Sequence, residues 1–397
     1  MKDKKILLTG ASIAGPTLAY WLHRYGFCVT IVERAAELRL GGQNIDVKGP
    51  AQQIARKMGI EESIRAKNTT ETGLRFVTVT NKTVAEFPKE NALSMTQELE
   101  ILRGDLVQIL YDNTKDDVQY RFDEHIVQLT QTEDGVQVTF SSGKTESFDL
   151  VIAAEGIGSN TRKLAFSDQP EFKYLGLYTA YLTIAKAPTD SSWARWCNAQ
   201  NGIVFLIRPD NYGATRASIT FTAKHDDYQA LSLAEQKTAL IARIEGSGWE
   251  SERIIKEIEK SNDLYFDRIS QVRALRWSEG RIALVGDAAY CATPIAGKGT
   301  DLAMAGAYIL AGELSNAKTY QEAFDAYESK MRPYVEKCQK LPLGIPGLVY
   351  PQSKFGVRIL NGLITLVGSK VASLLMTFLS SGKKVQKQEI ILPGYEQ

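Results

Sequence analysis

The chain has 397 residues and carries 47 lysines and arginines against 46 aspartates and glutamates. This length is enough for a large core and for about two to three domains. Because the charges balance, the composition gives no reason to expect nucleic acid or an anionic membrane as the main partner, and a small neutral or zwitterionic ligand is favoured.

The cysteines and histidines exclude further classes of protein. Four cysteines occur without any C-x-x-C pair, and three histidines stand far apart in the sequence. This pattern gives no basis for a metal site, a disulfide scaffold or c-type haem attachment. The apolar run near the N-terminus, residues 6–8, is too short for a signal peptide. We therefore expect a cytoplasmic protein.

The first elements of the chain predict a βαβ unit. Residues 6–8 indicate a buried strand, and residues 14–25 a helix with an apolar face. Residues 29–32 indicate a second short strand that ends at Glu33. The unit has about the length that nucleotide binding requires.

The remaining elements alternate between two types. The pattern predicts helices at 52–58 and 105–111, a β-meander over 126–138, a buried strand at 150–154, antiparallel strands at 174–185, 203–207 and 217–221, a helix at 233–244, a buried strand at 281–285 and a helix around 320–335. Buried strands therefore return after a stretch of alternating strands. We expect a discontinuous nucleotide domain into which a sheet-rich domain is inserted.

The turn between the first strand and helix reads Gly10-Ala11-Ser12-Ile13-Ala14-Gly15. A strand, a glycine turn and a helix N-terminus present unpaired N–H groups and partial positive charge, which suit a pyrophosphate. Ser12 departs from the usual G-x-G-x-x-G pattern, and its hydroxyl could donate to a phosphate oxygen instead. Taken alone, the turn also fits a strand-turn-helix without a nucleotide.

Glu33 strengthens the nucleotide interpretation. It lies about 20 residues after the turn, where a carboxylate can accept hydrogen bonds from both hydroxyls of a ribose. A site built for a 2′-phosphate favours a cation at this position. Arg34 is adjacent, so this feature leaves NADP open.

Two later segments join the turn in a specific order. They are EGIGSNTR at 155–162, and Gly286-Asp287 followed by Pro294 and by GKG at 297–299. With these three landmarks the chain resembles the FAD-dependent aromatic hydroxylases of the p-hydroxybenzoate hydroxylase type, from residue 4 to about 340. More narrowly, the segments at 41–49, 100–110 and 286–314 are similar to the tetracycline-inactivating monooxygenases of that family.

The resemblance implies roles for residues around the FAD dinucleotide. Gly10 and Gly15 would frame its pyrophosphate, Glu33 would hold the adenosine ribose, and Arg103 would lie beside the phosphate and ribityl chain. Asp287 would accept from a ribityl hydroxyl or a bound water. Together with residues nearer the flavin ring, the expected cofactor-binding set is Gly10, Ser12, Ala14, Gly15, Glu33, Arg34, Arg39, Asp46, Arg103, Asp287, Pro294, Gly297, Lys298 and Gly299.

The residues of this set nearest the flavin ring carry further expectations. Asp46 would stand near the isoalloxazine, Pro294 would line its substrate side, and Arg39 is a candidate for the phosphates of the nicotinamide cofactor. A helix that begins near Gly299 would direct its N–H groups at the flavin N1 and C2 carbonyl and stabilise the anionic reduced ring. Gly297 and Gly299 allow the backbone to approach a flat ring.

The chain departs from the family at several positions. Glu155 replaces the usual Asp, Tyr290 an often present His, and Lys298, Thr300 and Asp301 stand where Gln and Asn are commoner. We hypothesise that the charge of Lys298 supports the reduced flavin, offset by Asp301. A solvated surface lysine is the alternative.

The resemblance also implies a chemistry. NAD(P)H reduces FAD, dioxygen adds at the flavin C4a, and the hydroperoxide transfers one oxygen to an electron-rich ring or enol. We therefore expect FAD with NADPH or NADH as cofactors, dioxygen, and an aromatic or enolic substrate, with tetracyclines the most specific guess. No general base is evident. A flavin reductase or dehydrogenase without oxygen insertion and a ligand-sequestering flavoprotein remain the alternatives.

The C-terminal segment predicts a helix over residues 355–379. Its apolar side chains form one broad stripe, and Lys370 near the middle would cost about 3 kcal/mol in a membrane span. We expect this helix to pack across the substrate domain and close the pocket. A helix on a membrane surface is the alternative.

These expectations together define an α/β fold. A Rossmann-like FAD-binding domain would comprise 1–73, 99–172 and 268–341. A β-sheet-rich substrate domain would comprise 74–98 and 173–267, and the C-terminal helical segment 342–397. We expect a monomer.

Overall fold

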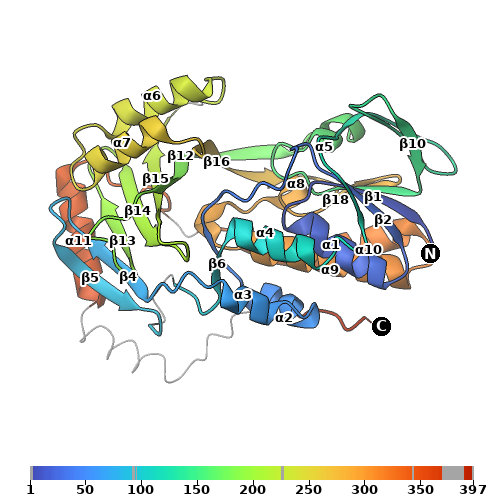
Figure 1. The fold of residues 1–397 in the computed structure, drawn as a ribbon, viewed down its shortest axis with the longest axis horizontal. Coiled ribbons are helices and arrows are strands. Elements are labelled where there is room, and N and C mark those ends of the chain that lie inside the picture. The colour runs from blue at the N-terminus through green and yellow to red at the C-terminus, as the bar shows by residue number, and fades with distance from the viewer. Residues whose placement is uncertain are drawn as a thin grey trace.

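The computed structural model describes residues 3–91, 94, 96–224, 228–341, 344–368 and 389–395. Figure 1 shows two sheets at opposite ends of the molecule, joined by chain segments that run between them. The structure confirms the predicted α/β class, with a mainly parallel sheet and a mainly antiparallel one.

The parallel sheet has the strand order β17-β18-β11-β1-β2-β7. Its strands are β1 (Lys5–Thr9), β2 (Cys28–Val32), β7 (Gln119–Arg121), β11 (Leu150–Ala153), β17 (Ser278–Glu279) and β18 (Ile282–Leu284). The central strands β11 and β18 are buried along their whole length. Continuous apolar runs of this kind are typical of parallel sheets that are covered on both faces.

Helices and a small sheet enclose the parallel sheet. The helices are α1 (Ala14–Arg24), α2 (Gly49–Lys57), α3 (Glu61–Ala66), α4 (Arg103–Asp112), α5 (Asn160–Ala165), α8 (Asp287–Tyr290), α9 (Gly299–Asn316) and α10 (Tyr320–Gln339). The meander consists of β8 (Ile126–Gln131), β9 (Val136–Phe140) and β10 (Thr145–Phe148). Helix α9 packs against α1, α2 and α10, and is buried on almost every side. A helix that is apolar all round belongs in such a position.

The antiparallel sheet has the order β16-β12-β15-β14-β13-β4-β5. Its strands are β4 (Gly73–Val77), β5 (Thr83–Pro88), β12 (Glu171–Ile184), β13 (Trp193–Asn198), β14 (Ile203–Pro209), β15 (Thr215–Thr222) and β16 (Tyr265–Arg273). Strands β3 (Asn44–Asp46) and β6 (Glu100–Leu102) pair with each other. We call the antiparallel sheet the substrate sheet, after its predicted role.

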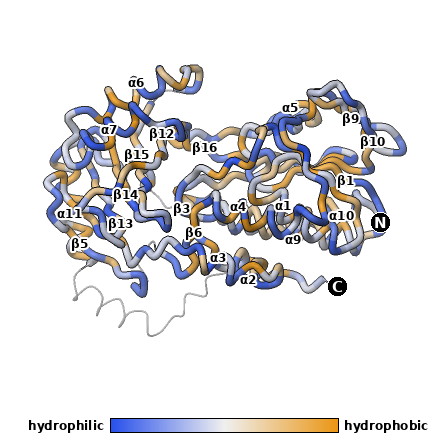
Figure 2. Tube along the Cα trace, viewed as in Figure 1, coloured by the Kyte–Doolittle hydropathy of each residue, from blue (hydrophilic) through white to orange (hydrophobic). Residues whose placement is uncertain are grey.

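Two amphipathic helices cover one face of the substrate sheet. Helix α6 (Leu233–Ile244) matches its predicted bounds, whereas α7 (Ser251–Lys260) was missed despite Ile254 and Ile258 one turn apart. Hydrophilic (blue) and hydrophobic (orange) residues alternate along these two helices in Figure 2. Their apolar residues pack on one set of alternate side chains of β12, so the other set faces away from them.

Several helix bounds differ from the predicted ones, the largest difference being at the end of α10, which extends to Gln339 rather than 335. Helix α2 begins three residues before the expected 52–58 because Pro50 fits its first turn, and α4 begins at Arg103 rather than at 105. Helix α11 (Lys354–Gly368) lies along β5, where Thr365 Oγ1 donates to the Val84 carbonyl at 3.4 Å. The rest of the predicted C-terminal helix, from residue 369, lies outside the described residues.

Among the helices that the structure describes, none is both long enough and apolar enough to cross a bilayer.

Residues 389–395, here called the C-terminal tail, return to the parallel-sheet side of the molecule and dock on α9 (Figure 1). Tyr308 Oη donates to the Pro393 carbonyl at 2.8 Å. The ring of Tyr395 lies 5.3 Å from that of Tyr308, and its hydroxyl donates to Glu313 at 2.5 Å. A Cβ at Gly312 would lie 2.2 Å from the Tyr395 ring, so this glycine makes room for the tail.

We expect Tyr395→Ala to lower the free energy of unfolding by about 1–3 kcal/mol, because it removes a packed ring and a hydrogen bond. Tyr395→Phe keeps the ring and should cost about 1 kcal/mol. Urea denaturation monitored by tryptophan fluorescence measures both. Equal stability of Tyr395→Ala and the parent chain would show that the tail contributes nothing.

Candidate functional site

The glycine turn between β1 and α1 is tightly built. Gly10 has φ of +99°, and a Cβ there would lie 2.6 Å from the Ala154 carbonyl oxygen. A Cβ at Gly15 would lie 2.0 Å from the Gly10 carbonyl oxygen. No side chain caps α1, so its first N–H groups are available to a ligand. Ala14 is buried, and its Cβ would lie 3.2 Å from a Cβ at Gly286. The first and third sequence landmarks therefore meet at this turn.

Glu33 is held against this turn. It is 6% exposed, and its carboxylate accepts the N–H of Ala11 at 2.9 Å and of Ala35 at 3.0 Å. The side chain of Arg34 is exposed, whereas Arg39 Nε lies 3.8 Å from the Glu33 carboxylate. Glu33 thus sits at the strand end, as the sequence predicts, and also fixes the turn.

Arg103 bridges the turn and the loop that follows β2. Its guanidinium donates to Ser12 Oγ at 3.2 Å and to the carbonyls of Arg39 and Gly41. Burial and the nearby Arg39 lower the pKa of Arg103. A pocket of about 10 Å³ lies here, lined by Ala11, Ser12, Glu33, Leu38, Arg39, Arg103 and Val107. The structure thus gathers residues from three separate segments at one place, and a guanidinium beside an uncapped helix suits an anion.

The loop before α9 is strained and open. Thr293 has φ of +86°, which is rare for a β-branched residue, and its buried hydroxyl has no hydrogen-bond partner among the residues that the structure describes. Pro294, Gly297 and Gly299 are exposed, and a Cβ added at either glycine would meet no atom within 4 Å. Helix α9 begins at Gly299 without a side-chain cap. A flat, electron-rich ring therefore has both space and free N–H donors here. The sequence places Thr293 directly before Pro294 but does not predict its strained conformation.

Two ion pairs lie beside this loop. Lys298 Nζ is 2.6 Å from Asp301, and Lys48 Nζ is 2.9 Å from Asp46. Burial raises the pKa of Asp301 to about 6, although Lys298 and Lys48 both oppose this rise. Asp301 is 1% exposed at its side chain and Lys298 is 26% exposed. Lys298 is therefore not a freely solvated lysine, and Asp46 lies near the loop through Lys48.

The second landmark, residues 155–162, is held together by side-chain hydrogen bonds. Glu155 accepts from Ser159 Oγ at 2.6 Å and from the N–H and hydroxyl of Thr161 at 2.8 and 2.7 Å. Arg162 donates to the carbonyls of Ile157 and Ala288, at 2.7 and 2.6 Å. The longer Glu155 side chain thus still holds the start of α5, and Arg162 ties this segment to α8. Asp287, at the start of α8, has a pKa that burial raises.

The face of the substrate sheet that lies away from α6 and α7 carries aromatic and polar side chains. A cluster on this face joins the sheet to the loop before α9, and its members are Leu175, Leu177, Trp196, Val204, Ile269, Ile295, Val349 and Tyr350. Tyr181 and Tyr265 lie on the same face with their rings 6.0 Å apart. Because Ile295 follows Pro294, this face meets the predicted flavin side of the molecule.

A buried charge cluster lies where the substrate sheet meets the pair of strands β3 and β6. Arg208 of β14 donates to Glu71 at 2.8 and 3.0 Å and also to Glu100 of β6. Asn44 and Thr69 donate to Glu100 as well, at 2.9 and 2.5 Å. Both carboxylates are 1% exposed. The sequence does not predict this cluster, because its members come from distant segments and share no regular spacing.

Comparisons with known proteins agree with this geometry. The family model described as FAD binding domain matches residues 3–341. A flavin-dependent monooxygenase of Legionella longbeachae (serogroup 1, strain NSW150) is 41% identical over 342 residues, which cover 85% of this chain and 88% of the relative. The flavin-dependent monooxygenase eupH of a Phoma species is 36% identical over 100% of this chain and 98% of its own.

A solved structure is similar over the whole fold. The crystal structure of tetracycline destructase Tet(55) is 34% identical, covers 100% of both chains and has a TM-score of 0.83. The chain therefore belongs to the family of FAD-dependent monooxygenases that carry this FAD-binding domain.

Proposed function

We propose that the chain is an NAD(P)H-dependent hydroxylase of a polycyclic or phenolic molecule, with tetracyclines as the most specific candidates. The observation that carries this proposal is the meeting of two features at Ile295: the uncapped start of α9 with its open glycines, and the aromatic face of the substrate sheet. The similarity to a tetracycline destructase supports the substrate class.

The residues present fit FAD. Gly10, Ser12, Ala14 and Gly15 would hold the pyrophosphate at the start of α1, and Arg103 would neutralise it. Glu33 would accept from the adenosine ribose, with Arg34 and Arg39 beside it. Asp287 would face the ribityl chain. The space beside Pro294, Gly297 and Gly299 would receive the ring, with Asp46 and Lys298 nearby.

When bound, FAD supplies electron transfer to dioxygen and insertion of one oxygen atom into the substrate. The chain's own residues would position the substrate and exclude water from the reacting face. The cluster around Ile295 and Tyr350 offers apolar contact, and Tyr181 and Tyr265 offer hydroxyls that can orient an oxygen-rich ring. Among the described residues of this face, none stands out as a general base. Helix α11 lies on β5, and we propose that the C-terminal helical segment closes the pocket.

The test follows the flavin and the substrate together. The purified protein is reduced anaerobically with NADPH or with NADH, and is then exposed to air with a tetracycline. We expect flavin absorption that bleaches and returns while the tetracycline spectrum changes, with NAD(P)H consumed in step with product. Oxidation of NAD(P)H that yields peroxide alone would indicate a flavin reductase. Tight binding of tetracycline without turnover would indicate a sequestering flavoprotein.

We expect Lys298→Gln to make the flavin harder to reduce, because it removes a partly buried cation beside the ring. If the reduced flavin loses about 1 kcal/mol of electrostatic stabilisation, its two-electron midpoint potential falls by roughly 20 mV. Dye-coupled reductive titration measures this shift. Lys298→Arg keeps the charge and should keep the potential. An unchanged midpoint in Lys298→Gln would reduce this residue to a structural partner of Asp301.

A further inference from the structure

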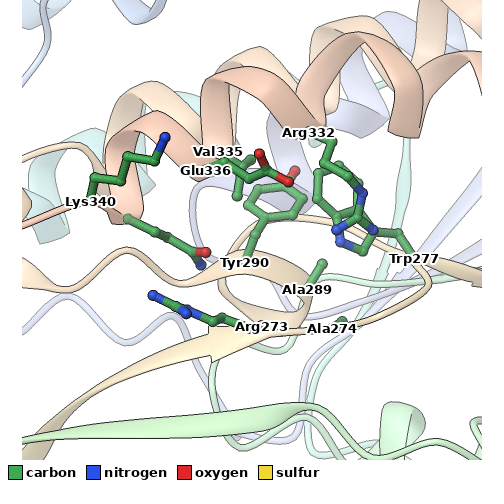
Figure 3. Close-up of a pocket in the computed structure, with 10 residues that line it drawn as sticks. Arg273, Ala274, Trp277, Ala289, Tyr290, Arg332, Val335, Glu336 and Lys340 are labelled. Atoms are coloured by element: carbon green, nitrogen blue, oxygen red, sulfur yellow. The ribbon is translucent and has the colours of Figure 1, made fainter.

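The ion pair of Lys298 and Asp301 has neighbours on the segment before α2, on α10 and on the C-terminal tail. Lys48, just before α2, opposes the rise that burial causes in the pKa of Asp301, so it lies within electrostatic reach. Burial also raises the pKa of the Cys338 thiol of α10, and Lys298 opposes that rise. Figure 3 shows another face of α10, which lines a pocket against α8. The ion pair therefore lies beside a different face of α10 from the one that lines this pocket.

The C-terminal tail is anchored at both of its ends. At one end, Tyr395 donates to Glu313 in the second half of α9. At the other, the carboxylate of Glu389 lies against Gly49, the first residue of α2, where an added Cβ would lie 2.8 Å from Glu389 Oε1. Gly49 has φ of +51° and leaves room for the carboxylate because it lacks a side chain. The tail therefore fixes where the charge of Glu389 lies.

Glu389 acts on both members of the ion pair. Burial is the main cause that raises the pKa of Asp301, and Glu389 adds to this rise. The pKa of Lys298 is raised against the effect of burial, mainly by Asp301 and in part by Glu389. In addition, no side chain caps the start of α2, and a carboxylate beside an uncapped helix start is favoured. Glu389 thus belongs to the charges beside the loop before α9.

These charges do not balance. Lys48 pairs with Asp46 and Lys298 with Asp301, so Glu389 leaves one negative charge over. A negative charge near the ring disfavours the anionic reduced flavin, and it weakens the field of the two ammonium groups. Residue 389 also lies outside residues 3–341, to which the FAD-binding family model matches.

We propose that Glu389 is a positioning residue of the flavin site, through which the docked C-terminal tail lowers the reduction potential of the flavin. This role rests on the placement of the ring beside Lys298 that is proposed above, and it is independent of the substrate. Glu389 acts through the two lysines, whose ammonium groups it restrains. Its removal should therefore shift the potential in the direction opposite to Lys298→Gln.

The test is dye-coupled reductive titration of the FAD-loaded protein without substrate or dioxygen. We expect Glu389→Gln to raise the ratio of reduced to oxidised flavin at a fixed potential about threefold, which is about 14 mV for a two-electron couple. Glu389→Asp keeps the charge and should match the parent chain. Glu62→Gln is the matched control, because Glu62 is 86% exposed at its side chain and pairs with Arg65 of the same helix. Its ratio should equal that of the parent chain.

The other end of the tail provides a second, independent measurement. Tyr395→Ala removes the anchor on α9, so Glu389 is held less firmly and the ratio should rise in the same direction. Tyr395→Phe keeps the packed ring and should leave the ratio near that of the parent chain. A shift in Glu389→Gln together with none in Tyr395→Ala would reject the role of the docked tail.

An unchanged ratio in Glu389→Gln, with flavin absorption retained, would overturn the proposal. Lys298→Gln shows which assumption has then failed. If Lys298→Gln lowers the ratio, the ring lies beside the loop before α9 and Glu389 does not act on it. If Lys298→Gln also leaves the ratio unchanged, the placement of the ring is wrong as well. A failure to insert oxygen into any substrate leaves this measurement untouched, because the titration involves neither substrate nor dioxygen.

Discussion

Replacing Arg208 by methionine should lower the free energy of unfolding by about 3–5 kcal/mol, since it leaves Glu71 and Glu100 buried without their counter-charge. Although burial alone would lower the pKa of Arg208, the two carboxylates hold it above its ordinary value. The arginine therefore stays charged under all ordinary conditions. Its loss exposes the two carboxylates to mutual repulsion in a low-dielectric site.

The size of this effect should depend on pH. Burial raises the pKa of Glu100 to about 7 from an ordinary value of 4.5, although Arg208 opposes the rise. The folded chain therefore takes up a proton between these values, and the stability that Glu100 contributes is lost as the pH rises through about 7. Without Arg208 the pKa of Glu100 rises further. The variant should lose more stability at about pH 8 than at about pH 5.5.

Urea denaturation at the two pH values tests both statements. The double variant Arg208→Met with Glu100→Gln also removes one of the two carboxylates that repel each other. It should recover much of the stability that Arg208→Met loses at the higher pH. Arg65→Gln serves as the control, because Arg65 is 42% exposed at its side chain and pairs with the exposed Glu98, so stability should hardly change. A loss in Arg208→Met that is independent of pH would contradict the charge argument.

Gly15→Ala should abolish the retention of FAD on purification. The added Cβ would lie 2.0 Å from the Gly10 carbonyl oxygen, a backbone atom that no rotamer change can move. The start of α1 must then shift away from the turn, and its N–H groups no longer converge on one anion. The measurement is the ratio of visible flavin absorption to protein absorption, followed by titration of the apoprotein with FAD.

The matched control is Gly362→Ala, also a helical glycine, whose added Cβ would meet no atom within 4 Å. Alanine in an exposed helix is favoured over glycine by about 1 kcal/mol, so this variant should keep its flavin and gain slightly in stability. Normal FAD content in Gly15→Ala would mean that the turn can relax without losing the dinucleotide, and that its role in binding is smaller than proposed.

The glycine turn could be predicted because its information is local. A buried strand, small residues and an apolar helix face follow one another within residues 5–24, and the structure has them there. The same holds for the start of α9, where Gly297 and Gly299 precede an apolar helix. Three landmarks in order also sufficed for the family, since each lies on an element end that the fold brings to one edge.

The substrate face could not be predicted in the same way. Alternation along β12 shows that Tyr178 and Tyr181 point to opposite sides, but only the position of α6 and α7 decides which side is open. The cluster of Arg208, Glu71 and Glu100 combines strands that are distant in the sequence, and pairing of this kind leaves no periodic signal.

The docked C-terminal tail makes the two ends of the chain unequal as attachment points for a fusion partner or an affinity handle. Near the N-terminus, Asp3 is exposed and held by one backbone hydrogen bond to Gly26, so added residues there would extend into solvent. At the other end, Tyr395 is engaged with Glu313 and Tyr308 of α9, so a label attached close to it would disturb this contact. An engineered version of this enzyme should therefore carry its label at the N-terminus.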